Sequence, residues 1–288
     1  MNYLLTYICP KNCSFCFFPT AEKNNNNEMT LETFKACFIH ARRLGMSRRV
    51  ALLGGEPTVA AHFRDIYSYI VENDVYVDAV YIFSNLMGTA NIRWWLTQPL
   101  PRSSTPLIFI WNNSEFLDLP LATQTEVMDN AKAILARGIK VVCSLTMTPR
   151  VTIPSLRYLS AVKDLGIRGI RFALDSLWTS ISEEQMSTLR SIDAYLRADG
   201  FSLGYDLCGS SYRIATIPGV NVKERCDGFC GDILPDGTVV PCMPWLRVKK
   251  RLRFTDVDNI AQAYLYYGVR PSDCGVCLAP ARSAIFDA

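Results

Sequence analysis

Three cysteines near the N-terminus constrain this chain more than any other feature. Cys9, Cys13 and Cys16 follow the spacing C-x3-C-x2-C, so their thiolates can surround one metal centre. A cubane iron–sulfur cluster normally takes four cysteine ligands, and three would leave one iron open to a small chelating molecule. A disulfide or a zinc knuckle is the alternative, although zinc sites usually combine a C-x2-C pair with a second such pair.

The segment that carries these cysteines is unusually apolar. Phe15, Phe17 and Phe18 stand among and directly after them, and we expect their rings to keep bulk water away from a bound cluster. Residues 2–8 are rich in aromatic and branched side chains, which predicts a strand that runs directly into Cys9. The cysteine loop is therefore expected at the C-terminal end of the first strand.

A glycine-rich turn follows one helix and one strand later. Gly54, Gly55, Glu56 and Pro57 come directly after an expected strand at residues 49–53. Because glycine permits unusual dihedrals and proline removes a donor, such a turn can leave backbone carbonyls and a carboxylate free for a ligand. These groups suit an ammonium ion, so the turn is a candidate binding site.

Strands and helices alternate through the first two thirds of the chain. The expected strands are 2–8, 49–53, 79–83, 107–111, 140–146 and 169–174, and the expected helices are 30–44, 62–72, 123–137 and 153–165. Such alternation produces parallel β/α units with the active site at the C-terminal ends of the strands, and six units form an open barrel. A further helix at 182–199 and a strand at 202–207 follow.

The composition changes at residue 208, because six cysteines follow while the β/α alternation stops. They are Cys208, Cys226, Cys230, Cys242, Cys274 and Cys277. Pro235, Asp236 and Gly237 predict a hairpin turn that brings Cys226 and Cys242 close together. With the C-x2-C pair at 274–277 these two could complete a four-cysteine site, and this spacing alone fits zinc and an iron–sulfur cluster equally well.

The C-x3-C-x2-C loop, followed by the Gly-Gly-Glu-Pro turn after the next strand, resembles the radical S-adenosylmethionine (SAM) superfamily. The resemblance implies a partial (β/α)6 TIM-like barrel in residues 1–207. It also implies a [4Fe–4S] cluster on Cys9, Cys13 and Cys16, whose open iron chelates SAM. The cofactor contacts implied by the resemblance are Gly54, Gly55 and Glu56 for the SAM amino group, Ser84, Asn85 and Ser144 for its ribose or carboxylate, and Arg171 for its carboxylate or for the substrate.

Residues 208–288 are similar to the auxiliary-cluster modules known as SPASM and twitch domains. Because no cysteine follows Cys277, the shorter twitch form with a β-hairpin is expected. The resemblance implies a second [4Fe–4S] cluster, whose ligands would be Cys226, Cys242, Cys274 and Cys277. Cys208 and Cys230 are then left over: either could replace a ligand, pack passively, or act as a catalytic thiol.

The resemblance also implies a reaction, in which SAM is cleaved to methionine and a 5′-deoxyadenosyl radical that takes a hydrogen atom from the substrate. A fully ligated auxiliary cluster would accept an electron, which favours dehydrogenation of a small polar substrate such as an aminocyclitol or a sugar. The short flanks of the two cysteine groups predict no leader-peptide-binding module. The alternatives are a maturase that crosslinks a ribosomally made peptide, an epimerase that uses Cys230 or Cys208 as hydrogen donor, and a non-catalytic metal-binding protein.

Composition argues against several other classes of protein. The 30 basic and 27 acidic residues give a net charge of +3 and are interspersed, so nucleic-acid binding is not indicated. No apolar stretch reaches the roughly 20 residues of a membrane span, and no export signal is evident. We therefore expect a cytoplasmic enzyme without membrane contacts, with an external electron donor such as flavodoxin or ferredoxin, and with a substrate and an oligomeric state that the sequence does not define.

Overall fold

The computed structural model describes residues 1–16, 18, 27–148, 151–174, 183–206, 231–240 and 251–267. Its parallel strands are β1 (Asn2–Leu4), β2 (Arg49–Leu53), β3 (Ala79–Ser84), β4 (Leu107–Asn112), β5 (Lys140–Met147), β6 (Gly169–Leu174) and β7 (Ser202–Asp206). The helices between and after them are α2 (Leu31–Arg43), α3 (Phe63–Glu72), α4 (Thr89–Leu96), α5 (Leu121–Ala136), α6 (Leu159–Asp164) and α7 (Glu183–Ala198). Strands and helices thus alternate as the sequence predicts.

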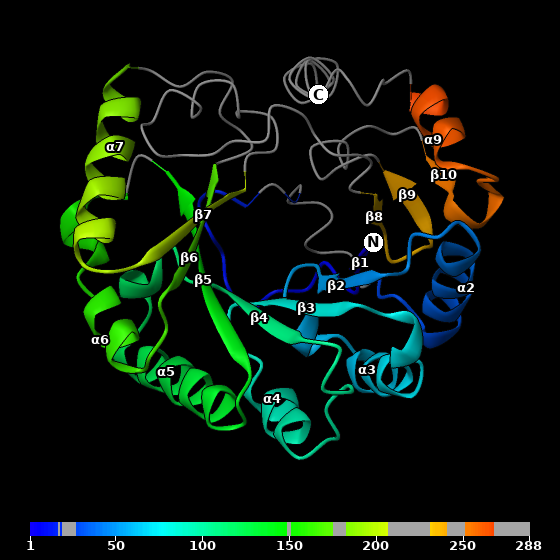
Figure 1. Ribbon diagram of the computed structural model, residues 1–288, viewed down its shortest axis with the longest axis horizontal. Helices are drawn as coiled ribbons and strands as arrows, with labels where there is room; N and C mark the ends of the chain where they lie inside the picture. The colour runs from blue at the N-terminus through cyan, green and yellow to red at the C-terminus, as the bar shows by residue number, and fades with distance from the viewer. Residues whose placement is uncertain are drawn as a thin grey trace.

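These strands form one curved sheet in chain order from β1 to β7, and each is parallel to its neighbour. Helices α2 to α7 follow one another around the convex side of the sheet (Figure 1). Parallel strands need such crossover helices, and right-handed crossovers place them all on one side when the sheet curls in one direction. The predicted partial α/β barrel is confirmed, with β7 continuing its sheet beyond the six predicted units.

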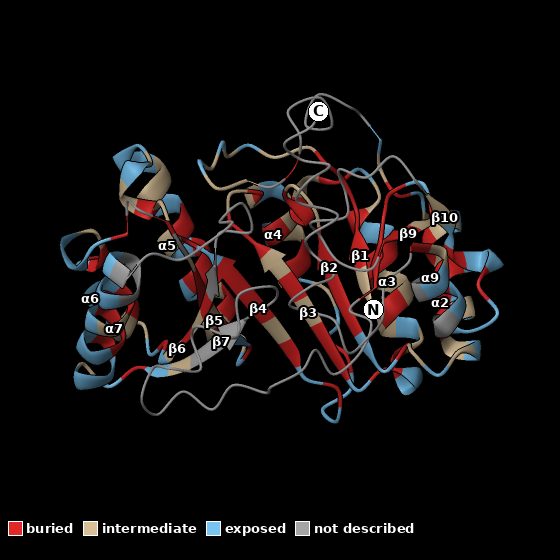
Figure 2. Cartoon of the chain, turned by 90° about the horizontal axis from the view of Figure 1, so that it is seen from above, coloured by how far each residue is buried: buried red, intermediate tan, exposed pale blue. Residues whose placement is uncertain are grey.

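Each face of the sheet has its own apolar cluster, because successive side chains of a strand point to opposite faces. Val50, Leu52 and Ile82 pack with side chains of the helices in the larger cluster. The alternate residues Leu4, Ala51, Leu53, Tyr81 and Phe83 belong to a second cluster on the concave face. Figure 2 shows that most of the strand residues are buried. The concave face of the sheet is therefore largely apolar, and a ligand bound there would be shielded from water.

Three predicted elements differ from those observed. The expected strand 2–8 is regular only over β1, because the chain beyond it turns to meet the end of β2. The expected helix 153–165 is interrupted, since a 3₁₀ helix at Ile153–Leu156 precedes α6. Helix α4 was not predicted: no side chain caps its N-terminus, and its two tryptophans do not favour a helix over a strand.

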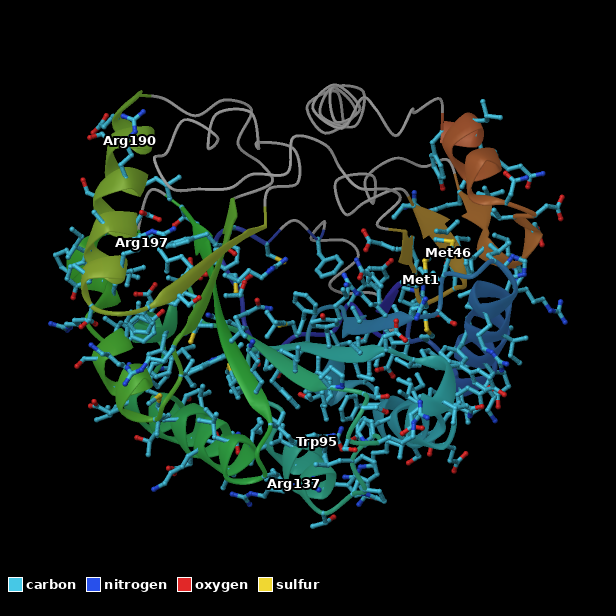
Figure 3. The ribbon with its side chains drawn as sticks, in the orientation of Figure 1. Met1, Met46, Trp95, Arg137, Arg190 and Arg197 are labelled. Carbon is cyan, nitrogen blue, oxygen red and sulfur yellow. The ribbon has the colours of Figure 1, made fainter. Side chains whose placement is uncertain are left out.

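Tertiary packing explains helix α4. Trp95 is fully buried, and the guanidinium of Arg137 lies 5.4 Å from the centre of its ring. Arg137 also donates hydrogen bonds to the carbonyl oxygens of Trp95 and Gln98, at 3.0 and 2.8 Å, and thereby ties the end of α5 to the end of α4. Figure 3 shows the two labelled side chains together at the outer edge of the barrel.

The described part of residues 208–288 continues the same sheet. Strand β8 (Asp232–Ile233) runs parallel to β1, and β9 (Thr238–Val240) and β10 (Leu252–Arg253) follow in antiparallel order. The predicted hairpin turn is confirmed, with Gly237 in the left-handed region at φ +80°. A 3₁₀ helix at Phe254–Asp256 and helix α9 (Ile260–Tyr267) complete this region. The domain boundary after residue 207 stays a prediction.

Side-chain contacts fasten this hairpin region to the barrel. The ring nitrogen Nε2 of His40, on α2, lies 2.7 Å from the carbonyl oxygen of Val257. Asn2 donates a hydrogen bond of 2.7 Å to the carboxylate of Asp232. His40 is a half-buried helical side chain, as the sequence suggests. Among the residues that the structure describes, no helix has the length and apolar character needed to cross a membrane.

Candidate cofactor site at the ends of strands β1 to β3

The cysteine loop leaves the sheet and returns to it at one place. After β1, the N–H of Leu5 donates to the carbonyl oxygen of Leu53 at 2.8 Å, which continues the pairing with β2. On the return, the N–H of Met29 donates to the carbonyl oxygen of Leu5 at 2.8 Å, and Thr6 forms a β-bridge with Glu28. Both ends of the loop are therefore fixed at the C-terminal end of β1, as predicted.

The cysteines lie over the apolar interior of the barrel. Cys9, Cys13 and Cys16 are each partly exposed. Cys16 packs against the concave cluster, whose member Phe18 is buried and meets the ring of Tyr7 edge-on at 5.3 Å. Phe15 is half-buried and Phe17 lies outside the described residues. At least one of the predicted aromatic side chains therefore separates the loop from water.

The environment of Cys9 disfavours a bare thiolate. The pKa of this thiol is raised to about 12, because burial and the negative charges of Glu56, Cys13 and Cys16 outweigh a hydrogen bond from the backbone N–H of Lys11 that lowers it. A metal centre would supply the positive charge that this crowding of acidic groups lacks. The loop is thus better suited to a bound cation or cluster than to three free thiolates.

The glycine turn is in direct backbone contact with the start of the cysteine loop. The N–H of Gly55 donates to the carbonyl oxygen of Thr6 at 2.7 Å, and the N–H of Glu56 donates to that of Ile8 at 2.9 Å. A Cβ atom at Gly55 would lie 2.3 Å from the Ile8 oxygen, and one at Gly54 would lie 2.4 Å from the Thr6 oxygen. Gly54 also has φ +148°. Two glycines are therefore required for the two motifs to meet.

Glu56 connects this turn to the end of strand β3. Its side chain is fully buried, and one carboxylate oxygen accepts hydrogen bonds from the N–H and hydroxyl of Thr58, at 3.1 and 2.6 Å, and from the hydroxyl of Ser84 at 2.8 Å. The other oxygen accepts from the backbone N–H of Asn85 at 2.6 Å. Burial raises the pKa of Glu56, and these donors lower it. In this structure the carboxylate therefore holds the turn, and its contact with SAM stays a proposal.

Asn85 reaches the cysteine loop from β3. Its side-chain nitrogen lies 3.5 Å from the sulfur of Cys9, within hydrogen-bonding range for sulfur. Ser84 and Asn85 are both buried, so the two residues predicted from strand β3 lie together with the glycine turn. Six of the predicted site residues thus form one group, whose members are Cys9, Gly54, Gly55, Glu56, Ser84 and Asn85.

Ser144 and Arg171 form a second group on the neighbouring strands β5 and β6. They are paired in register, and the Arg171 guanidinium donates to the Ser144 hydroxyl at 3.1 Å. The same guanidinium lies 5.2 Å from the centre of the Phe83 ring on β3. Phe83 directly precedes Ser84, so Arg171 approaches the strand that carries part of the first group. This arrangement leaves polar groups at one side of an apolar interior.

Two other side chains near the strand ends have structural surroundings. Ser114 accepts a hydrogen bond of 2.5 Å from the backbone N–H of Thr146. Cys143 is fully buried in the larger apolar cluster. Asn113 is also buried: its backbone carbonyl oxygen accepts from the hydroxyl of Tyr158 at 3.1 Å, whereas its side-chain amide has no hydrogen-bond partner among the described residues.

One functional contact was missed by the sequence reasoning. Glu115 follows the polar residues 112–114 at the end of β4, and its carboxylate accepts hydrogen bonds from both the hydroxyl and the N–H of Ser14, at 2.5 and 3.2 Å. Ser14 lies between Cys13 and Cys16. Glu115 could have been identified by extending the search for polar residues one position beyond the strand end.

The donor set fits a cubane cluster. Three thiols from one loop, in mutual electrostatic contact, agree with one thiolate on each of three irons. No three His, Cys, Asp or Glu side chains within the described ranges are arranged to hold a single metal ion. The predicted ligands Cys226, Cys242, Cys274 and Cys277 and the predicted thiols Cys208 and Cys230 all lie outside the described residues.

Comparison with known proteins agrees with this site. The sequence profile of the Radical SAM superfamily matches residues 3–93, which include the cysteine loop, the glycine turn and strands β1 to β3. No curated protein matches the sequence. Residues 3–93 of the chain are therefore similar to the radical SAM superfamily.

Solved structures of radical SAM enzymes share the fold. SuiB from Streptococcus suis bound to precursor peptide SuiA has a TM-score of 0.68 at 15% identity, over 96% of this chain and 69% of SuiB. SuiB bound to S-adenosylmethionine has a TM-score of 0.67 at 15% identity, over 93% of this chain and 66% of SuiB. Native anSMEcpe with bound AdoMet has a TM-score of 0.62 at 14% identity, over 91% of this chain and 80% of anSMEcpe. The chain thus spans about two thirds of the length of SuiB.

Proposed function

We propose that Cys9, Cys13 and Cys16 hold a [4Fe–4S] cluster and that the glycine turn beside them binds SAM. The observation that carries this proposal is the backbone contact between the two motifs, in which Gly55 and Glu56 donate to the carbonyl oxygens of Thr6 and Ile8 immediately before the first cysteine. When bound, the cluster supplies one electron to SAM, which then yields methionine and a 5′-deoxyadenosyl radical able to remove a hydrogen atom from a substrate.

The chain's own residues would orient the cofactor in two ways. We assign the backbone of Gly54 and Gly55 to the SAM amino group, because the turn resembles the second radical SAM motif and its contact with Thr6 and Ile8 holds it beside the cysteine loop. Ser84 extends this surface from strand β3. We assign Ser144 and Arg171, on strands β5 and β6, to the carboxylate of SAM or to a polar group of the substrate.

The apolar interior would protect the reaction from water. Leu4, Leu53 and Phe18 are buried on the concave face, and the rings of Tyr81 and Phe83 pack beside them. A reactive radical survives longer where few water molecules and few alternative hydrogen donors can reach it. The protein would thus contribute binding, orientation and exclusion of solvent, while the cofactors provide the chemistry.

For the overall reaction, the first candidate is dehydrogenation of a small polar substrate such as an aminocyclitol or a sugar. It is supported by the polar pair Ser144 and Arg171, which can bind hydroxyl or anionic groups at one side of the interior. An auxiliary [4Fe–4S] cluster on Cys226, Cys242, Cys274 and Cys277 would accept the second electron. This cluster is proposed from the spacing of the cysteines together with the resemblance to twitch modules.

The second candidate is a peptide maturase. It is supported by the likeness to SuiB bound to precursor peptide SuiA and to anSMEcpe bound to the Cp18Cys peptide, since both share this fold. A thiol of Cys230 or Cys208 that returns hydrogen to the substrate would give an epimerase instead. Transfer of deuterium from a labelled sugar or peptide into 5′-deoxyadenosine would distinguish the two substrate classes.

The proposal is tested by anaerobic reconstitution with iron and sulfide, followed by incubation with dithionite and SAM. We expect the wild-type protein to form 5′-deoxyadenosine and the Cys13→Ala variant to form none. The matched control is Cys37→Ala. It removes a thiol that is buried in the larger apolar cluster, between the sheet and the helices, and not in the cysteine loop. Formation of 5′-deoxyadenosine by Cys13→Ala at the wild-type rate would overturn the proposal.

A further inference from the structure

The side-chain amide of Asn85 has a fixed orientation toward the first cysteine of the loop. Its oxygen accepts a hydrogen bond of 2.9 Å from the backbone N–H of Met87. Because only the oxygen of an amide can accept from an N–H, the nitrogen must be the atom that faces Cys9, at 3.5 Å from its sulfur. Asn85 is buried and both contacts are partly buried, which limits competition from water.

The backbone around Asn85 is held by the carboxylate of Glu56. This carboxylate accepts from the N–H of Asn85 and from the hydroxyl of Ser84, and the same hydroxyl accepts from the N–H of Leu86 at 2.9 Å. Leu86 has φ +61°, a left-handed conformation that is unfavourable for a branched apolar side chain. The surrounding hydrogen bonds and the full burial of Leu86 maintain this turn.

We propose that Asn85 acts as a positioning residue that donates a hydrogen bond to the Cys9 sulfur and thereby raises the reduction potential of the cluster. Glu56 serves this function indirectly, because it sets the backbone from which Asn85 extends. This inference rests on the proposed function, since it requires a cluster on the cysteine loop. It assigns Asn85 to the sulfur ligand rather than to SAM.

The direction of the effect follows from charge. Reduction adds one electron to the cluster, and part of the added negative charge resides on the thiolate sulfurs. A hydrogen bond to such a sulfur stabilises the reduced state more than the oxidised state, so its loss makes reduction less favourable. The backbone N–H of Lys11 also donates to Cys9, whereas the neighbouring side chains of Glu56, Cys13 and Cys16 carry or can acquire negative charge and give no such stabilisation.

The test is a redox titration of the reconstituted holoenzyme with dithionite, monitored by electron paramagnetic resonance. The signal that changes when SAM is added identifies the cluster on the cysteine loop. For Asn85→Leu, which removes the donor at nearly equal volume, we expect about a tenfold lower ratio of reduced to oxidised cluster at a given potential. This corresponds to a midpoint about 59 mV more negative for a one-electron couple.

A second variant covers the case in which the leucine disturbs folding. In Asn85→Ser, the short hydroxyl can still accept from the Met87 N–H, as serine does in similar turns, but cannot reach the Cys9 sulfur. We expect the same negative shift. The matched control is Asn130→Ser, because Asn130 is also buried and donates to the Leu86 carbonyl oxygen at 2.9 Å, yet has no hydrogen bond to a cysteine.

The outcomes separate the two proposals. A negative shift in both Asn85 variants, with a wild-type midpoint in Asn130→Ser, would support the inference. An unchanged or more positive midpoint in an Asn85 variant that retains wild-type iron content would overturn the inference and leave the proposed function intact. If the wild-type protein itself shows no SAM-sensitive signal, the proposed function fails, and the inference fails with it.

Discussion

The two groups of site residues are built by different kinds of interaction. The group at the ends of β1 to β3 is connected by backbone hydrogen bonds, by two glycines that admit no side chain, and by one buried carboxylate with several donors. The group on β5 and β6 consists of Ser144 and Arg171, which are neighbours in the sheet and are joined by a hydrogen bond between their side chains. The geometry of a backbone contact is nearly the same whichever side chain is present. A side-chain contact, in contrast, changes when its residue is substituted.

This difference agrees with a division between a constant and a variable part of the reaction. Binding of cluster and SAM needs the same geometry for any substrate, which suits the rigid group. Recognition of a particular substrate needs side chains that differ from one enzyme to another, which suits the pair on β5 and β6. We therefore expect substitutions in the first group to affect cluster and stability together, and substitutions in the second to affect binding.

The largest effect is expected for Gly55→Ala. The new methyl group would lie 2.3 Å from the Ile8 carbonyl oxygen, so the turn and the cysteine loop must separate. We predict a loss of about 3 kcal/mol in the free energy of unfolding, together with loss of most of the reconstituted iron. Chemical denaturation and iron analysis would measure the two effects.

The control for this variant is Gly138→Ala. Gly138 has φ +74°, but a methyl group there would meet no atom within 4 Å. We expect about 1 kcal/mol of destabilisation from backbone strain and a wild-type iron content. Equal iron contents in the two variants would show that the close approach at Gly55 does not matter for the cluster.

A pH-dependent effect is expected at the other side of β1, where the hairpin strand β8 joins the sheet. Burial raises the pKa of Asp232 to about 7, while the hydrogen bond from Asn2 and the N-terminal charge lower it. Because the pKa is raised in the folded state, the contribution of Asp232 to stability is fully present below its ordinary pKa and is lost as the pH rises toward 7.

The variant Asp232→Asn should remove this dependence, since the amide keeps an oxygen that accepts from Asn2. We predict that the melting temperature of the variant relative to wild type increases from pH 4 to pH 7 and is constant above pH 8. Thermal unfolding across this range would measure it. A difference between the two proteins that is the same at every pH would contradict the assignment.

For the second group, Arg171→Leu is expected to weaken binding without loss of the cluster. Removing a guanidinium that binds an anionic group should raise the dissociation constant of SAM, or the KM of the substrate, by about tenfold or more. Iron content and the cluster midpoint should remain at wild-type values. A parallel fall in iron content would mean that the two groups are not independent, and the comparison would fail.

The smallest effect is expected for Glu115→Ala, which removes the carboxylate bound to Ser14 in the cysteine loop. Because this contact is exposed, we predict less than about 1 kcal/mol of destabilisation. Iron should nevertheless be lost faster to a chelator, since the loop would open more often. Asp118→Ala, an exposed acid on the same segment without a bond to the loop, should lose iron at the wild-type rate.

The sequence predicted those helices and strands whose residue propensities and capping residues agree with their packing in the fold. Strand β2 ends where predicted, because branched residues stop at two glycines, and helix α2 follows its cap at Thr30. Helix α4 was missed because the buried contacts of Trp95, and not local propensity, determine it. The two motifs were each recognisable, but their backbone contact depends on the register between β1 and β2.

The roles of the individual site residues were less predictable. Asn85 was predicted as a SAM contact, and its contact with Cys9 depends on which face of the turn after β3 meets the cysteine loop. Glu56 was predicted to present its carboxylate to a ligand, and its burial depends on Thr58 and Ser84. Residue type and spacing define which groups are present, whereas the fold determines which of them meet.

The central claim is that the cysteine loop and the glycine turn together hold a cluster with SAM bound to it. Electron–nuclear double resonance of the reduced, reconstituted protein tests this most directly, with SAM isotopically labelled at its amino nitrogen. We predict a hyperfine coupling of the labelled nitrogen to the cluster in the wild-type protein and none in Gly55→Ala. Absence of the coupling in a wild-type protein that contains the reduced cluster would contradict the account.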